Sequence, residues 1–199
     1  MAPRFLDLLL TPDVMAAQAR YYGRSLAVPP TEEKDQLGLD ETEFIAGLDS
    51  FYLASVNPDG WPYVQHRGGP KGFLKVIGPS ELGFADFKGN RQLITTGNLS
   101  RDGRVCLFLM NYPLQARLKI LGRAVVLGAK DDPGLARKLA PPGLLRSVER
   151  LVRIQVEGFD WNCPSFITRR FSEVEVTQAI QPLRDRIAEL EAELSQLKG

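Results

Sequence analysis

Three short segments carry the basic and aromatic side chains that are best suited to binding an anionic or planar ligand. The first, residues 65–75, combines His66, Arg67, Lys71 and Lys75 with three glycines. Arginine forms two parallel charge-assisted hydrogen bonds to phosphate oxygens, and the N–H groups of glycine-rich turns also suit a phosphate. A solvated, flexible loop is the alternative interpretation of this segment taken by itself.

The second segment, residues 84–92, ends an expected strand and opens an expected helix. Asn90 and Arg91 would then lie near a helix N-terminus, where the helix dipole and the free N–H groups stabilise anions. Two basic, glycine-containing strand ends in one small domain predict a phosphate site.

The third segment, residues 159–171, places Trp161 before the paired Arg169 and Arg170. An aromatic residue that follows a strand is most often part of the core, which is the simplest interpretation of Trp161. Arginines near a tryptophan can also clamp and stack on a planar ring. For Cys163, in the same segment, we expect inert packing rather than a redox role.

Composition excludes several classes of protein and site. The chain has 199 residues, 44% of them hydrophobic, and 25 basic against 24 acidic residues give a net charge of +1. This balance argues against broad electrostatic binding to nucleic acid or to an acidic membrane surface.

No apolar run approaches the length of about 18 residues that spans a bilayer. Two scattered cysteines and a single histidine provide neither a disulfide framework nor an ordinary zinc site, so we expect no metal. A cytoplasmic protein is the simplest expectation.

The elements that must position these segments begin with two short helices. The sequence Thr-Pro-Asp at residues 11–13 combines a hydroxyl cap with a proline and an early acid, and predicts a helix that ends near Gly23. Residues 26–39 are expected to form an irregular arm. Asp40 and Glu43 have the spacing of a capping box, which predicts a second short helix.

From residue 51 the apolar pattern alternates, which is typical of strands, and the turn sequence at residues 57–60 predicts a β-hairpin. The expected strands are residues 51–57, 61–65, 73–77, 82–86, 104–112, 117–127 and 151–159. Helices are expected at residues 89–96 and 131–150. Because the strands are consecutive and mostly linked as hairpins, without βαβ alternation, we expect a mainly β (α+β) antiparallel barrel with flanking helices.

The C-terminal segment has the apolar spacing of a coiled coil, with alternating intervals of three and four residues. The apolar positions are Ile180, Leu183, Ile187, Leu190, Leu194 and Leu197. In a parallel pair of such helices, Arg186 would face Glu191 of the other helix, and Glu193 would face Lys198. A surface helix packed on its own barrel is the alternative. The expected organisation is therefore an N-terminal helix and arm (1–39), a barrel domain (40–172) and a C-terminal helix (173–199).

Several segments within residues 40–171 resemble the pyridoxamine 5′-phosphate oxidase-like, FMN-binding split-barrel family, in its predicted flavin-nucleotide-binding bacterial branch. They are Asp86-Phe87-Lys88-Gly89-Asn90-Arg91-Gln92, Thr96-Gly97-Asn98-Leu99, Asp102-Gly103-Arg104-Val105, Arg117-Leu118-Lys119-Ile120-Leu121-Gly122-Arg123-Ala124, and Trp161-Asn162-Cys163-Pro164 with Arg170. The resemblance implies an antiparallel split β-barrel that forms a homodimer and binds FMN in clefts between the subunits.

The resemblance also implies which residues contact FMN. Arg67 and the strand of residues 73–75, which contains Lys75, resemble the flavin-contacting strand of the family, and Phe84 and Ala85 match the strand whose backbone borders the ring. Asn90 and Arg91 match the phosphate-holding positions, with Lys88 as a nearby candidate. Arg117 stands where the family often has a glutamine near the flavin, and Trp161 and Arg170 match residues that the other subunit contributes.

Two departures argue against oxidation of pyridoxamine phosphate itself. Residues 165–168 contain neither the arginine nor the histidine that engages pyridoxal phosphate in the true oxidase, and residues 128–142 lack its phosphate-gripping Tyr, Arg and Ser set. The expected function is an FMN-dependent oxidoreductase that acts on another small molecule, with no evident catalytic acid or base. The alternatives are a non-catalytic flavin-binding or sensing module, or a split barrel that uses a deazaflavin or haem, for which His66 is the only conventional imidazole ligand.

Overall fold

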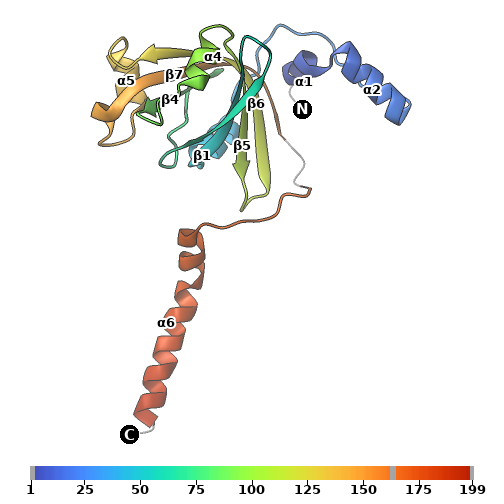
Figure 1. Cartoon of the computed structure of the whole chain (residues 1–199). Coiled ribbons are helices and arrows are strands. Elements are labelled where there is room, and N and C mark those ends of the chain that lie inside the picture. Colours follow the sequence, from blue (N-terminus) through green and yellow to red (C-terminus); the bar gives the residue numbers. More distant parts are fainter. Residues whose placement is uncertain (1–2, 162–164, 198–199) are drawn as a thin grey trace.

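Seven antiparallel strands form one strongly curved sheet, with helices at its ends and a long helix that extends away from it (Figure 1). This computed structural model describes residues 3–161 and 165–197. The strands are β1 (Ser50–Val56), β2 (Pro62–Gly68), β3 (Lys75–Gly78), β4 (Glu81–Phe87), β5 (Arg104–Asn111), β6 (Ala116–Gly128) and β7 (Val148–Trp161). Their order in the sheet is β2-β1-β5-β6-β7-β4-β3, so β2 and β3 are the two edges. The expected antiparallel split barrel is confirmed.

The hairpin of β1 and β2 forms for the local reason that the sequence indicates. The Asn57 side-chain oxygen accepts hydrogen bonds from the backbone N–H groups of Asp59 (3.1 Å) and Trp61 (2.8 Å). Gly60 has φ 87°, a left-handed conformation that glycine adopts at little cost. The turn therefore fixes the register of the hairpin, in which Val56 lies opposite Pro62.

The core of the barrel follows from the alternation of apolar residues along the strands. Leu53, Leu107, Leu118 and Ile154 are completely buried, and they come from four different strands. Phe51 also packs against the ring of Phe73 (5.6 Å between centroids) and edge-on against Phe84 (5.5 Å). A core of this size needs no disulfide to hold the domain together.

The helices are α1 (Pro3–Leu9), α2 (Pro12–Tyr22), α3 (Leu39–Ala46), α4 (Ile94–Leu99), α5 (Pro133–Leu139), the 3₁₀ helix η1 (Leu145–Ser147) and α6 (Glu173–Leu197). Helix α2 has the predicted Thr11 cap and ends at Gly23, as expected.

Three helix predictions are wrong in position or extent. The capping carboxylate of α3 is Glu41, which accepts a hydrogen bond from the N–H of Gly38 (2.8 Å), so the Asp40–Glu43 capping box does not form. Helix α4 begins at Ile94 rather than at residue 89. The segment expected as one helix over residues 131–150 contains α5, a loop, η1 and the start of β7.

The N-terminal arm lies along β7 of its own barrel. The Asp35 carboxylate accepts a hydrogen bond from the N–H of Phe159 (3.0 Å), and the N–H of Asp35 donates to the carbonyl of Glu157 (3.2 Å). Helix α1 packs against the same strand at Gly158, where an added Cβ would lie 2.7 Å from the backbone nitrogen of Phe5. The arm is therefore held on β7 by backbone contacts and by the Asp35 carboxylate.

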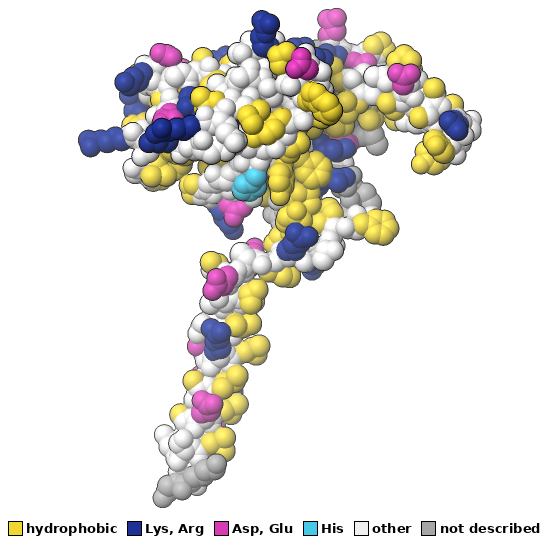
Figure 2. Space-filling model, viewed as in Figure 1, with side chains coloured by type: hydrophobic (Ala, Val, Ile, Leu, Met, Phe, Trp, Pro, Cys, Tyr) yellow, Lys and Arg dark blue, Asp and Glu magenta, His cyan; other side chains and the backbone are white. Residues whose placement is uncertain are grey.

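Helix α6 projects away from the barrel, and none of its residues is buried (Figure 1). The alternative that this helix packs along its own barrel is therefore not what the structure shows. Its apolar side chains lie in a row along one side (Figure 2). Within the described residues, no helix combines the length and the apolar character that crossing a bilayer requires.

Candidate functional site

A polar cleft of about 210 Å³ opens where β2, β4 and β7 meet the loop of residues 88–93. We call it the basic cleft. Its lining is dominated by basic, amide and hydroxyl side chains: Gln65, Arg67, Asp86, Phe87, Gly89, Asn90, Arg91, Leu93, Thr95, Thr96 and Arg150. The cleft thus contains Arg67, Asn90 and Arg91, three of the residues expected to contact a cofactor.

Asp86 organises the floor of the basic cleft. Its two carboxylate oxygens accept hydrogen bonds from Arg67 Nη1 (2.9 Å) and Arg150 Nε (2.8 Å), and all three side chains are at least four-fifths buried. Arg150 lies directly opposite Asp86 in the β4–β7 ladder, whereas Arg67 comes from β2 at the far edge of the sheet. Burial by itself lowers the pKa of Arg150, but the hydrogen bonds to Asp86 and Glu149 leave that pKa raised, so the guanidinium stays charged.

The basic cleft has an excess of positive charge. Arg67, Arg91 and Arg150 line it, whereas Asp86 is the single carboxylate among its lining residues. The Nε of Arg67 is buried and has no hydrogen-bond partner. An unpaired buried donor of this kind costs about 1–3 kcal/mol. An anion with several oxygen atoms would balance the charge and satisfy the donor, so these residues fit a phosphate group.

The loop of residues 88–93 folds over the cleft through an unusual backbone conformation. Arg91 (φ 63°) and Leu93 (φ 53°) both adopt the left-handed region, which side-chain-bearing residues rarely occupy. The Asn90 side chain stabilises the bend, because its oxygen accepts a hydrogen bond from the N–H of Gln92 (3.1 Å). Asn90 and Arg91 therefore reach the cleft from a loop that precedes α4, and not from the start of a helix. Such strain tends to be concentrated at functional sites.

Sequence reasoning missed Arg150, Gln65, Thr95 and Thr96. Arg150 lies in a segment expected to be helical, so nothing in the sequence indicated that it faces Asp86. Thr95 donates a hydrogen bond to the Gln65 side chain (2.9 Å), which links α4 to β2 at the rim of the cleft. The available signal was the carboxylate of Asp86 itself, since a buried acid normally has basic partners.

Lys75, Phe84, Ala85 and Lys88 are not among the residues that line the basic cleft. Lys75 Nζ donates to the carbonyl of Lys138 in α5 (2.8 Å). Phe84 and Ala85 are buried, and the Arg67 guanidinium lies over the Phe84 ring at 5.7 Å. Lys88 lines an adjoining depression that also contains Arg91 and Arg150.

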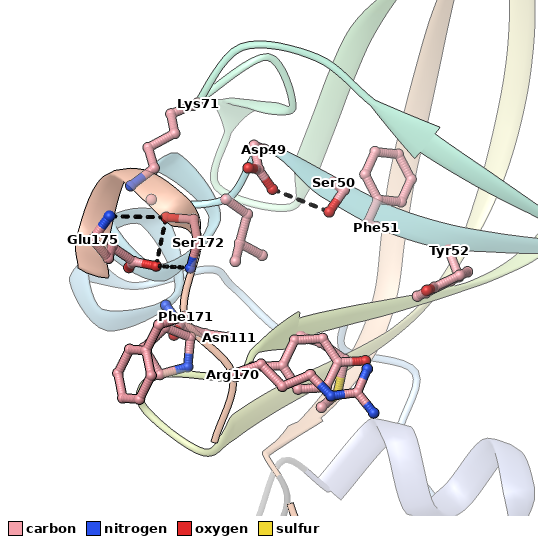
Figure 3. Close-up of a pocket in the computed structure, with 15 residues that line it drawn as sticks. Asp49, Ser50, Phe51, Tyr52, Lys71, Asn111, Arg170, Phe171, Ser172 and Glu175 are labelled. Atoms are coloured by element: carbon pink, nitrogen blue, oxygen red, sulfur yellow. Dashed lines mark hydrogen bonds between the residues drawn. The ribbon is translucent and has the colours of Figure 1, made fainter. Parts of the chain in front are cut away.

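A second cleft, of about 280 Å³, lies between the start of β1, the end of β5 and the segment that leads into α6 (Figure 3). We call it the tail cleft. Arg170 lies over the Tyr112 ring at 4.9 Å, and Lys71 stands near the first turn of α6. The tail cleft and the basic cleft have no lining residue in common.

Arg117 and Trp161 also lie outside the basic cleft. The Arg117 guanidinium packs over Phe108 at 5.0 Å, and its Nε is buried without a hydrogen-bond partner. Trp161 donates to Glu41 (2.6 Å) and packs edge-on against Phe44 (4.8 Å). Within one chain, Arg117, Trp161 and Arg170 therefore do not join Arg67, Asn90 and Arg91.

His66, another candidate for chemistry, does not line the basic cleft. It is exposed on β2 with its ring against Tyr52 (5.6 Å). Cys163 lies outside the described residues. Within the described part of the chain, no three His, Cys, Asp or Glu side chains are grouped closely enough to hold a metal ion.

Several solved structures are similar to this chain, and the first of them supports the fold. A candidate pyridoxamine 5′-phosphate oxidase from Lactobacillus delbrueckii is 21% identical, with a TM-score of 0.50 over 64% of this chain and 96% of that one. General stress protein 26 from Bacillus anthracis is 17% identical (TM-score 0.47, covering 60% and 88%). An FMN-binding protein from Syntrophomonas wolfei is 11% identical (TM-score 0.47, covering 63% and 86%). A search of curated proteins found no match.

The family model described as pyridoxamine 5′-phosphate oxidase matches residues 40–140. This match covers half of the chain, from α3 to the segment after α5, and it includes Arg67, Asn90 and Arg91. On that evidence, the chain belongs to the pyridoxamine 5′-phosphate oxidase family.

Proposed function

We propose that this protein is an FMN-dependent oxidoreductase that acts on a small molecule, and that the basic cleft holds the phosphate of FMN. The observation that carries the proposal is the set of three arginines around one carboxylate, with a buried Arg67 Nε that has no partner. A phosphate monoester carries a charge of about −1.5 to −2 at neutral pH, which is opposite in sign to the surplus charge of the residues that line the cleft.

The residues of the cleft divide into fixed and adjustable groups. Asp86 holds the guanidinium groups of Arg67 and Arg150 in place, so both present hydrogen-bond donors without having to be ordered by the ligand. Asn90 and Arg91 are exposed on their loop and can close on a bound phosphate. Bound FMN supplies the redox chemistry, while the chain supplies position, positive charge and exclusion of water.

We further propose that the protein acts as a homodimer, with the flavin ring between the subunits. Arg117, Trp161 and Arg170 lie apart from the basic cleft of their own chain. Trp161 and Arg170 of the partner subunit would therefore complete the site, and Arg117 and Arg170 are the candidates to supply positive charge near the ring. The Nε of Arg117 is buried without a hydrogen-bond partner, and a partner supplied by a ligand or a second chain would remove that cost.

The phosphate assignment is tested by replacing Arg91 with alanine. Each charge-assisted hydrogen bond that is lost should cost about 1.5–3 kcal/mol, or roughly ten- to more than a hundredfold in FMN affinity. The measurement is fluorescence titration of the apoprotein with FMN. Arg137→Ala, an exposed arginine in α5, is the matched control and should bind FMN like the unsubstituted protein. Unchanged affinity in Arg91→Ala would place the phosphate elsewhere.

A second measurement separates an oxidoreductase from a binding module. The purified protein is made anaerobic, NADH or NADPH is added, and the visible absorbance of the flavin is followed. Bleaching supports an enzyme that accepts hydride, whereas a spectrum that no donor changes supports a non-catalytic module. The visible spectrum of the purified protein also identifies the cofactor. A Soret band that disappears in His66→Ala would indicate haem rather than a flavin.

A further inference from the structure

Helix α6 has the features of a helix that lacks its partner. It spans 25 residues, Glu173–Leu197, and none of them is buried by the rest of the chain. Isolated helices owe little stability to the backbone alone and are normally stabilised by packing of an apolar face. The apolar row of α6 in Figure 2 therefore needs a surface to pack against.

The apolar row follows a strict heptad pattern. The row consists of the six apolar residues of the predicted seam, from Ile180 to Leu197, and of Val176, which precedes Ile180 by four residues. The intervals between successive members alternate between four and three residues, so the row covers three heptads. Its central members are well exposed, with Leu183 at 65%, Ile187 at 56% and Leu194 at 53%. An interval of 3.5 residues keeps one seam facing a second helix along its whole length.

We propose that the α6 helices of two copies of this chain pair as a parallel, two-stranded coiled coil. Ile180 and Ile187 occupy the first two a positions and Leu194 the third, and the d positions that follow them are all leucine: Leu183, Leu190 and Leu197. This combination of β-branched a residues with leucine at d favours two parallel strands. Pro182, inside the helix, falls at a c position, so the backbone bond that it lacks lies outside the seam.

The charges beside the seam fit the same arrangement. Arg186 at g would face Glu191 at e of the partner subunit, and Glu193 would face Lys198, which lies outside the described residues. In the single helix, Arg186 pairs with Glu189 (2.8 Å), but both side chains remain more than half exposed and available to a second chain.

The chain is also fixed where it enters α6. The Gln115 side chain donates to the carbonyl of Ile167 (2.7 Å), and Arg169 donates to Gln115 (3.0 Å). Ser172 and Glu175 then form a reciprocal cap, because Glu175 accepts from the N–H of Ser172 (2.7 Å) while Ser172 Oγ accepts from the N–H of Glu175 (3.3 Å).

A parallel pair of α6 helices would hold the two barrels at the same end of the coil. An antiparallel pair would separate them by about 37 Å, at 1.5 Å per residue.

Cysteine cross-linking in the full-length chain tests the pairing. Cys106 and Cys163 are first replaced by serine, and Leu183→Cys and Leu190→Cys are then made singly in that background. In a parallel coil, each d-position cysteine meets its own copy, so both variants should form disulfide-linked dimers on oxidation. Ala192→Cys, at an outward-facing f position, is the matched control and should remain monomeric on a non-reducing gel. Cross-linking of neither variant, of only one of them, or of the control to the same extent would overturn the proposal.

A charge swap in the Leu190→Cys background gives a second, independent readout. Arg186→Glu should place like charges across the seam and reduce the rate of cross-linking about tenfold. Adding Glu191→Arg should restore the rate. Residues five apart do not face each other on one helix, so rescue requires a contact between chains. Failure of the second substitution to restore cross-linking would contradict the parallel register. None of these measurements requires bound FMN, so they stand or fall separately from the proposed function.

Discussion

At the scale of single residues, Asp86 decides the geometry of the basic cleft. Its carboxylate pairs with both Arg67 and Arg150, and these three residues come from three different strands. Without the carboxylate, two buried guanidinium groups would lie close together with no charge between them, which is costly in a poorly solvated site. The aspartate therefore fixes the positions of both guanidinium groups while it stabilises the fold.

We expect Asp86→Asn to lower the free energy of unfolding by about 2–3 kcal/mol, because two hydrogen bonds between charged groups are weakened. Urea denaturation followed by circular dichroism measures the change. Asp59→Asn, in the exposed turn between β1 and β2, is the control and should unfold like the original chain. Equal stability of the two variants would show that the ion pairs of Asp86 contribute little.

A second residue-scale prediction concerns the cap of α6. Hydrogen bonds from the N–H and hydroxyl of Ser172 hold the pKa of Glu175 below its usual value. Because the folded pKa is depressed, the cap contributes stability above the pKa of the free carboxyl and loses it as the pH falls through the folded value. Acidification below the pKa of the free carboxyl should therefore release the first turn of α6 as the pH falls through the lower value of the folded chain.

Amide hydrogen exchange at residues 173–176, measured between pH 6 and pH 3, follows this release. The rates are corrected for the intrinsic pH dependence of exchange. Glu175→Gln keeps a hydrogen-bond acceptor but does not titrate, so its corrected exchange should not change over this interval. A wild-type profile as flat as that of Glu175→Gln would show that the carboxylate does not control the helix start.

At the scale of elements, close backbone contact positions the N-terminal helix. An added Cβ at Gly158 in β7 would lie 2.7 Å from the nitrogen and 2.9 Å from the Cα of Phe5. Since these are backbone atoms, they cannot move aside without shifting α1 as a whole. The contact explains why a glycine occurs within a long strand at this point.

We expect Gly158→Ala to displace α1 and the arm at a cost of about 1–3 kcal/mol, while the barrel stays folded. Limited proteolysis should then cut within residues 1–30 faster than in the original chain. The control is Gly97→Ala in α4, where an added Cβ meets nothing within 4 Å. Unchanged proteolysis of Gly158→Ala would mean that the arm is held elsewhere.

At the scale of the whole molecule, the proposed dimer makes a site that neither chain completes alone. Arg91 would come from one subunit and Arg170 from the other, so each variant Arg91→Ala or Arg170→Ala should by itself weaken both sites. In a mixed dimer of the two variants, one site carries both substitutions and the other carries none. Co-expression with two affinity tags isolates such mixed dimers.

Fluorescence titration should then show one high-affinity FMN site per mixed dimer and none in either parent. A mixed dimer as weak as its parents would mean that Arg91 and Arg170 serve the same chain or different ligands. This outcome would leave the coiled-coil proposal intact, because cross-linking of α6 is measured without the cofactor.

The sequence by itself determined the features that depend on neighbouring residues. The alternation of apolar residues predicted the strands, the Asn57–Gly60 turn predicted a hairpin, Thr11 and Gly23 predicted the limits of α2, and the heptad spacing predicted a long C-terminal helix. Each of these follows from local backbone preferences or from the period of one element, so no knowledge of the rest of the chain is needed.

Only the tertiary structure decided how the basic cleft is built. Arg67 and Arg150 are 19 and 64 residues from Asp86, and they meet it because the curved sheet brings β2 towards β4 and β7. The left-handed conformations of Arg91 and Leu93 oppose the local preferences of these residues, so local reasoning placed a helix there. The strained loop lies beside Arg67 and Arg150 only because the curved sheet brings their strands together, so the cleft that Asn90 and Arg91 line exists only in the folded chain.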